Sequence, residues 1–240
     1  MDFIFLIFAF AAEVIGTIAG FGSSTIALPF SIFLFDFHTA LILVAFLHLF
    51  GNLGRLGFFR SGLDKTILLR FGAPSILFTI CGAFLVTYIP QEILKGILGI
   101  FLIAYTFMSW SGSLSLKPTV SMAFIGGGLS GFFAGLIGTG GALRGAFLDI
   151  FGLSKERYIP TAAAIALAVD GTRLPIYLRE GFLETRFYWM LPILFIIALL
   201  GSYVGRQIVS SMPQQSFRRV VLAAIFVVGV KFIYDWVIWI

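Results

Sequence analysis

Charged residues are scarce in this chain of 240 residues: only 11% are Asp, Glu, Lys or Arg, against about 25% in soluble domains. Hydrophobic residues make up 60%, more apolar surface than a soluble domain this small can bury. Cysteine is nearly absent, and Cys81 is the single one. A single cysteine excludes an intramolecular disulfide. We expect Cys81 to pack as a small buried hydrophobe. Together these shortages exclude a soluble enzyme, a nucleic-acid binder and a disulfide scaffold.

The few charges are also separated by long intervals. Residues 71–91, 96–116, 118–143 and 187–205 contain none of them. Each interval is about long enough, at roughly 20 residues, to cross the hydrocarbon of a bilayer as a helix. We therefore predict an all-α, multi-pass (polytopic) membrane protein, with lipids around it and no nucleic-acid partner.

The two halves of the chain resemble each other. The segment GTIAGFGSS at 16–24 is similar to GFFAGLIGTG at 131–140, and NLGRL at 52–56 is similar to DGTRL at 170–174. Further matches in the same order are Pro74 with Pro192 and Gly82 with Gly201. Ordered matches of this kind indicate a duplication. We expect a single transmembrane domain over 1–240, with a first repeat at 1–117 and a second at 118–240.

Hydropathy predicts the same plan in each half: a long apolar stretch with a glycine-rich break, then three ordinary spans. In the first half these are about 3–36, broken near 20–24, then 39–59, 67–89 and 92–112. In the second half they are about 120–152, broken near 135–141, then 158–178, 187–209 and 216–238. The prediction amounts to about eight hydrophobic segments.

The positions of Lys and Arg separate two topologies. If each broken stretch crosses the membrane once, the basic residues divide almost evenly between the two sides. If each is a hairpin that returns to its starting side, ten of these basic residues lie on one side of the membrane and four on the other. The ten are Arg55, Arg60, Lys65, Arg70, Lys117, Lys155, Arg157, Arg206, Arg218 and Arg219, and the four are Lys95, Arg173, Arg179 and Arg186. The second distribution fits the positive-inside rule better. We therefore expect two inverted-topology repeats, each a membrane hairpin followed by three transmembrane helices, with both termini outside.

The two breaks predict an anion site. Irregular backbone at membrane depth survives only where protein buries it or where it lines a polar cavity. Helices that restart after a break present free N–H groups and the positive ends of their dipoles, and two such ends near the midplane attract an anion. The predicted donors are Ser23, Ser24, Thr25, Thr139, Gly140 and Gly141. The alternative is that the glycines serve only close helix packing.

Two arginines repeat with the duplication. Arg55 follows Asn52 by three residues, and Arg173 follows Asp170 by three, so each couple shares a helix face. The planar guanidinium fork suits an oxyanion, with Asn52 and Asp170 orienting it. The alternative is that both arginines lie at helix ends and extend to the membrane interface.

Two further residues are candidates without a symmetric counterpart. Arg144 lies just past the second break and either contacts a substrate or forms an ion pair with Asp149 or Asp170. His48 lies four residues before Asn52, on the same helix face. It is the candidate carrier of a coupled proton, and its alternative role is a hydrogen-bonded packing residue.

Enzyme motifs are absent from the sequence: it has no GxSxG, HExxH or P-loop. The two histidines have no Cys or carboxylate at ligand spacing, so we predict no metal, no cofactor, no catalytic residues and no enzymatic activity. A transporter would draw on an ion gradient or on the substrate's own gradient. A passive anion channel and a non-transporting membrane subunit remain alternatives, and a homo-oligomer is left open.

The duplicated layout, with AGFG at 19–22 and AGLIGTGG at 134–141 each opening a half, resembles the sulfite exporter TauE/SafE family of membrane permeases. The resemblance covers essentially the whole chain. Arg144-Gly145 stands where the family pattern has proline. The resemblance implies a secondary transporter, an exporter of small sulfur-containing oxyanions such as sulfite or organosulfonates such as sulfoacetate, acting across the cytoplasmic membrane on a small anionic substrate.

Overall fold

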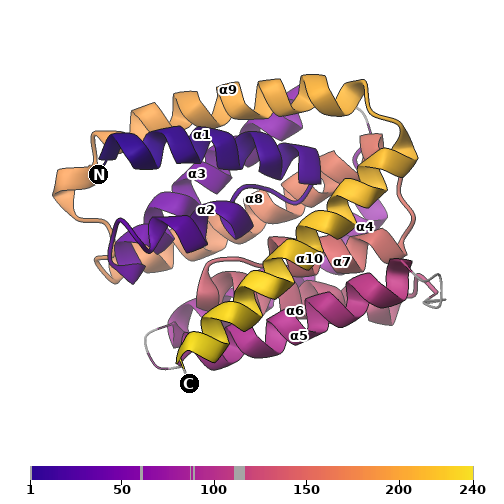
Figure 1. Cartoon of the computed structure of the whole chain (residues 1–240), viewed down its shortest axis with the longest axis horizontal. Coiled ribbons are helices and arrows are strands. Elements are labelled where there is room, and N and C mark those ends of the chain that lie inside the picture. The colour runs from indigo at the N-terminus through magenta and orange to yellow at the C-terminus, as the bar shows by residue number, and fades with distance from the viewer. Residues whose placement is uncertain (1, 60–61, 87, 89, 111–116, 240) are drawn as a thin grey trace.

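The computed structural model describes residues 2–59, 62–86, 88, 90–110 and 117–239 (Figure 1). Within this part of the chain there are ten α-helices, one short 3₁₀ helix and no strand, which confirms the all-α prediction. Arg60, counted above among the loop charges, lies outside the described residues, and so does the side chain of Lys95.

Each half contains a long helix, a short helix and three further long helices. The first half consists of α1 (Asp2–Ala19), α2 (Ser24–Ser31), α3 (Phe37–Phe58), α4 (Lys65–Leu85) and α5 (Gln91–Trp110). The second consists of α6 (Val120–Ile137), α7 (Gly141–Ile150), α8 (Lys155–Arg179), α9 (Met190–Ser210) and α10 (Gln214–Trp239), with the 3₁₀ helix Thr185–Phe187 before α9. The breaks lie at 20–23 and 138–140, within or beside the predicted intervals.

Five of the described helices are long and apolar enough to cross a membrane: α3, α4, α6, α9 and α10. Two others, α1 and α5, contain the shorter apolar segments Phe3–Ala19 and Gly96–Phe107. Large apolar side chains such as Phe3, Ile7 and Leu69 are exposed, as expected where lipid replaces water. The predicted total of eight segments stays a prediction.

The short helices turn back beside the helices that precede them. Figure 1 shows α2 running back beside α1, and α7 packs on α6 in the second half. Both turns depend on glycines with positive φ, which side chains disfavour: Gly22 has φ 96°, and Gly138, at the end of α6, has φ 76°. Each broken stretch is therefore a helix pair, not one continuous crossing.

The long helices pack in corresponding pairs in the two halves. α4 packs on α6, and α9 packs on α1. A Cβ on Gly131 of α6 would lie 2.1 Å from the carbonyl oxygen of Ser75, and one on Gly205 of α9 would lie 2.6 Å from the Cβ of Thr17. These glycines therefore serve close helix packing, the role considered above as the alternative for glycines near the breaks.

Cys81 is exposed on α4, so the expectation of a buried cysteine is wrong. The helix packs on α6 through Ser75 and Thr79, whose hydroxyl groups each donate a hydrogen bond at 3.0 Å to a carbonyl oxygen of α6. Its opposite face, with Ile80, Cys81 and Phe84, points outward. In lipid an apolar side chain gains nothing from burial in protein, so a small hydrophobe is as stable outside.

Two hydrophobic clusters lie on either side of a layer of buried charged and histidine side chains, called the polar layer below. Its members are Glu13, His48, Arg55, Arg144, Asp170 and Arg173. In α1, Phe5 belongs to one cluster and Ala19 to the other, with the buried Glu13 between them. In α8, Tyr158 and Tyr177 belong to different clusters in the same way. The polar layer crosses the middle of the bundle, where the two breaks also lie.

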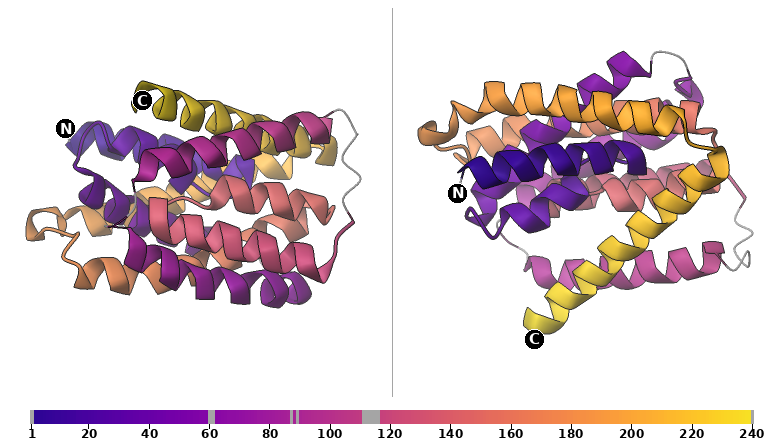
Figure 2. Two further views of the ribbon diagram at one scale, coloured as in Figure 1. Left: turned by 90° about the horizontal axis from the view of Figure 1, so that it is seen from below. Right: turned by 45° about the horizontal axis from the view of Figure 1, so that its top comes forward.

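The two short helices differ in what covers them. α7 packs on both α5 and α10. α2 instead borders an apolar crevice of about 300 Å³ that separates it from α10, and Figure 2 shows the two helices from two further sides. The crevice is lined by Phe8, Thr25, Ile26, Phe30, Phe33, Val227, Val228, Lys231 and Phe232.

Several predicted loop charges of the majority side meet at one end of the bundle. Arg157 at the start of α8 pairs with Asp64 at 2.6 Å, directly before Lys65. Lys155 donates to the backbone carbonyl of Val209 at 2.9 Å, near the turn between α9 and α10. This grouping is compatible with the hairpin topology, and the inverted relation of the repeats remains a prediction.

Cysteine labelling tests that topology. In a Cys81→Ala background, which removes the single thiol, we expect a membrane-impermeant maleimide to label Lys65→Cys and Arg179→Cys from opposite faces in oriented vesicles. The reason is that hairpins put these positions on different sides. Labelling of both positions from one face would contradict inverted repeats.

Candidate anion-binding site

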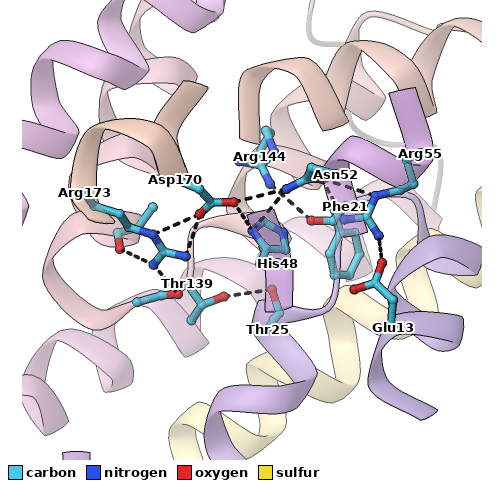
Figure 3. Close-up of polar contacts among 12 residues, drawn as sticks. Glu13, Phe21, Thr25, His48, Asn52, Arg55, Thr139, Arg144, Asp170 and Arg173 are labelled. Atoms are coloured by element: carbon cyan, nitrogen blue, oxygen red, sulfur yellow. Dashed lines mark hydrogen bonds and ion pairs between the residues drawn. The ribbon is translucent and has the colours of Figure 1, made fainter. Parts of the chain in front are cut away.

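Six charged or histidine side chains are buried among the described residues of the polar layer (Figure 3). They come from four helices: Glu13 of α1, His48 and Arg55 of α3, Arg144 of α7, and Asp170 and Arg173 of α8. The exposed fractions of the three arginines are 1%, 2% and 1%. They do not extend to the membrane interface, which rules out that alternative for Arg55 and Arg173. Counting these two as loop charges was therefore wrong, and without them the predicted ten against four becomes nine against three.

Arg55 is fully engaged by neighbours in the first half. Its Nη1 donates to Oε1 of Glu13 at 2.5 Å and to Oγ1 of Thr17 at 3.0 Å. Its Nη2 and Nε donate to Oδ1 of Asn52 at 2.7 and 3.2 Å. Ser202 of α9 adds a hydrogen bond to the same Glu13 oxygen at 2.9 Å. The predicted Asn52–Arg55 couple is therefore formed, with Glu13 as its counter-charge.

Arg173 is engaged in a similar way in the second half. Its Nη2 lies 2.7 Å from Oδ1 of Asp170, which confirms the predicted couple. Its Nη1 donates to the carbonyl oxygens of Ala134 and Gly138 at 2.9 and 2.7 Å. Carbonyls at a helix C-terminus have no partner within the helix and carry partial negative charge. Arg173 therefore holds the end of α6 at the second break.

Asp170 joins the two halves through His48. Nδ1 of His48 lies 2.7 Å from Oδ2 of Asp170, and Nδ2 of Asn52 donates to the same oxygen at 3.2 Å. An ionised carboxylate can only accept hydrogen bonds, so we assign the proton of neutral His48 to Nδ1. The other ring nitrogen, Nε2, then carries a lone pair and faces Gly22, where a Cβ would lie 2.0 Å from it.

The two breaks are in direct contact. Oγ1 of Thr139 donates to Oγ1 of Thr25 at 2.8 Å, and Nη2 of Arg144 donates to the carbonyl oxygen of Phe21 at 3.1 Å. Gly141 packs on the same carbonyl group: a Cβ added to Gly141 would lie 2.8 Å from the carbonyl oxygen of Phe21. The structure thus brings the predicted donors of the two halves together, all of them buried: Ser23, Ser24, Thr25, Thr139, Gly140 and Gly141.

Four buried polar atoms have no hydrogen-bond partner among the described residues: Oε2 of Glu13, and, around this contact, Oγ of Ser23, Nε2 of His48 and Nε of Arg144. Buried polar atoms in proteins are nearly always hydrogen-bonded to protein or water, so the three atoms around the contact are candidates for contact with a ligand. Ser23 is the N-cap of α2, yet its side chain makes no capping bond. Its hydroxyl group therefore remains available at the positive end of the helix.

A family model described as Sulfite exporter TauE/SafE matches residues 4–232, which include both breaks and every residue of the polar layer. The chain belongs to the sulfite exporter TauE/SafE family. The searches of curated proteins and of solved structures found no match.

Membership of the TauE/SafE family, together with the apolar helices, makes the chain an integral membrane protein and a transporter of sulfur compounds. The prediction from the motifs of 19–22 and 134–141 is therefore confirmed at the level of the family.

In this TauE/SafE protein, the two carboxylates of the polar layer, Glu13 and Asp170, pair with Arg55 and Arg173. The positive charge of Arg144 is left without a counter-charge within the ranges that the structure describes. No ion pair of Arg144 occurs among the described residues, so neither partner considered above is used: Asp149 pairs with Arg218 at 3.0 Å, and Asp170 pairs with Arg173. Three guanidinium groups thus share two carboxylates. The excess positive charge lies beside the breaks, where the free helix ends already favour an anion.

Glu13 is a member of the polar layer that the predicted site does not include. It is the only carboxylate between Asp2 and Asp36, and such isolated charges in apolar spans usually pair or line a pathway. That signal was available in the sequence. Its partner Arg55 lies 42 residues away, and spacing within one helix cannot reveal it.

The Asp170 network predicts a large stability loss on removal of one charge. Asp170→Asn leaves Arg173 buried without a counter-charge, which costs on the order of 3–5 kcal/mol. We expect a clearly lower melting temperature of the purified protein in detergent. Glu184→Gln is the matched control, because Glu184 and its partner Arg186 are exposed and surface pairs contribute little. Equal melting temperatures of the two variants would contradict the assigned role of Asp170.

Proposed function

We propose that this protein is a secondary transporter that exports small sulfur oxyanions, such as sulfite or organosulfonates like sulfoacetate, across the cytoplasmic membrane. Arg144 carries the proposal. It is a fully buried guanidinium group without a carboxylate partner, placed where two helix breaks of opposite halves touch. An unpaired charge at this depth is costly, so its retention favours a ligand that supplies the missing negative charge.

In this proposal the substrate is held by groups from both halves. Ser23, Ser24 and Thr25 at the start of α2, and Thr139, Gly140 and Gly141 at the start of α7, supply hydroxyl and backbone N–H donors. Sulfite and sulfonate groups carry three oxygens, so they accept bonds from several directions at once. Arg144 supplies the charge, since a guanidinium group forms strong charge-assisted hydrogen bonds.

The other two arginines act as positioning residues in this scheme. Arg55 bonds to Glu13 and Asn52, and Arg173 bonds to Asp170 and to the last carbonyls of α6. Their charges are balanced by Glu13 and Asp170, and their hydrogen bonds hold the two breaks in place. Asn52 and Asp170 orient them, and His48 is the proposed carrier of a coupled proton.

Alternating access would follow from the unequal packing of the two short helices. In transporters with inverted repeats the two repeats exchange conformations around a fixed site. α7 packs on α5 and α10, whereas a crevice separates α2 from α10. We propose that the transport cycle closes the crevice by moving α2 onto α10, and that α7 separates from α5 in the same step.

Transport by Arg144→Gln tests the assignment of the anion site. We expect efflux of radiolabelled sulfoacetate from proteoliposomes to fall at least about 100-fold, because loss of a charge-assisted bond in a desolvated site costs on the order of 3 kcal/mol. Arg206→Gln is the control, since Arg206 is exposed on α9 and should leave the flux unchanged. Wild-type flux in the Arg144→Gln protein would contradict the site.

Filling the crevice tests the proposed motion. Val227→Trp adds a bulky side chain to its wall and should lower the flux at least about tenfold by obstructing closure, because packed protein tolerates little extra volume. Ligand-induced thermal stabilisation should persist, since the site itself is unaltered. Val230→Trp is the matched control, because Val230 is also an exposed valine of α10 but is not among the residues that line the crevice. Unchanged flux in Val227→Trp would exclude closure of the crevice from the cycle.

A further inference from the structure

The charges of the polar layer specify how much negative charge the site accepts. Arg55 is neutralised by Glu13 at 2.5 Å, and Arg173 is neutralised by Asp170 at 2.7 Å. Among the described residues, the side chain of Arg144 makes a hydrogen bond to a backbone carbonyl only. With His48 neutral, the layer therefore carries one net positive charge. A ligand with one negative charge makes the loaded layer neutral, which is the least costly state in a low-dielectric environment.

A second negative charge on the ligand would need a second positive charge, and His48 is the residue that provides one. It is the histidine of the layer, and histidine changes its charge near neutral pH. Its Nδ1 is occupied by Asp170 at 2.7 Å, whereas its Nε2 is buried and has no partner. The lone pair of neutral Nε2 repels an anion, while a protonated Nε2 becomes a hydrogen-bond donor.

The charged groups around His48 come from each of the packed elements. Asp170 lies on α8, Arg55 and the polar Asn52 lie on α3 with His48 itself, and Arg144 lies on α7. Glu13 of α1 is the remaining charge of the layer, and it packs on Gly51 of α3 while pairing with Arg55. The negative charge of Asp170 attracts a positively charged ring, while the positive charges of Arg55 and Arg144 repel it. An additional anion beside Arg144 shifts this balance toward protonation.

We propose that the site binds singly charged sulfur oxyanions without a proton, and doubly charged ones together with one proton on Nε2 of His48. This inference rests on the proposed function, because it concerns the ligand of the same site. Sulfoacetate and sulfite dianions would then bind with a proton, whereas hydrogen sulfite and simple alkanesulfonates would bind alone. Both kinds of loaded site carry the same total charge, so one conformational cycle serves both.

Titration calorimetry with two ligands of fixed charge tests the proposal. Methanesulfonate is a monoanion and sulfoacetate a dianion between about pH 5.5 and 8.5, since a carboxylate titrates near pH 4. For the purified full-length protein in buffers of different ionisation enthalpy, we expect uptake of close to one proton per sulfoacetate where His48 starts neutral, and none for methanesulfonate. The affinity for sulfoacetate alone should fall as the pH rises, by about tenfold per pH unit wherever binding takes up one full proton.

His48→Gln and His38→Gln form the matched pair of variants. His38 is the other histidine and lies outside the polar layer, at the start of α3. In His48→Gln, proton uptake with sulfoacetate should disappear, and the affinity ratio of sulfoacetate to methanesulfonate at acidic pH should fall at least about tenfold. His38→Gln should behave as the wild type. The wild-type titration tests the proposal by itself even if His48→Gln does not fold.

Two results would overturn the proposal while leaving the anion site intact: equal proton uptake with both ligands, or uptake with sulfoacetate that persists in His48→Gln. Absence of binding heat and of thermal stabilisation with either ligand is a different outcome. That outcome would overturn the proposed function itself. It would also overturn the proposal that doubly charged ligands bind with a proton and singly charged ones without.

Discussion

The structure depends on the neutralisation of charges that are buried at membrane depth. An isolated ion there destabilises the fold by several kcal/mol, and the chain contains three buried guanidinium groups in one layer. The Glu13–Arg55 pair connects α1 to α3, and the His48–Asp170 contact connects α3 to α8. The same pairs that stabilise the bundle leave one cation, Arg144, without a carboxylate partner among the described residues. In the proposed function, stability and anion binding are therefore two consequences of a single distribution of charge.

Glycine makes this distribution possible. Gly22 has a positive φ and lies where any Cβ would overlap with His48, so the first break can approach the histidine only without a side chain. Gly138 has the same role at the second break, where its carbonyl accepts a bond from Arg173. Arg144 and Arg173 thus stabilise the backbone of the two breaks through hydrogen bonds to its carbonyl oxygens. The irregular backbone in turn leaves room for the charged side chains in the middle of the bundle.

Local features of the sequence predicted most of the helices and both breaks. Apolar runs and glycine-rich intervals act within a few residues, so α3 at Phe37–Phe58 and α9 at Met190–Ser210 correspond to the predicted 39–59 and 187–209. The couples Asn52–Arg55 and Asp170–Arg173 were also predictable, because residues three apart share a helix face. Cys81 was not, since burial depends on which face of α4 meets α6. The repeat boundaries and the eight-segment count remain predictions.

The sequence by itself determined that the chain is an all-α membrane protein, where its helices break, and which residues carry charge into the membrane. Only the tertiary structure decided how those charges are paired. Arg55 pairs with Glu13 across 42 residues and Asp170 pairs with His48 across 122, while Arg144 pairs with no carboxylate in the described part of the chain. The physical reason is that Coulomb energy depends on distance in space, and helix packing, not spacing along the chain, sets the distance between residues of different helices.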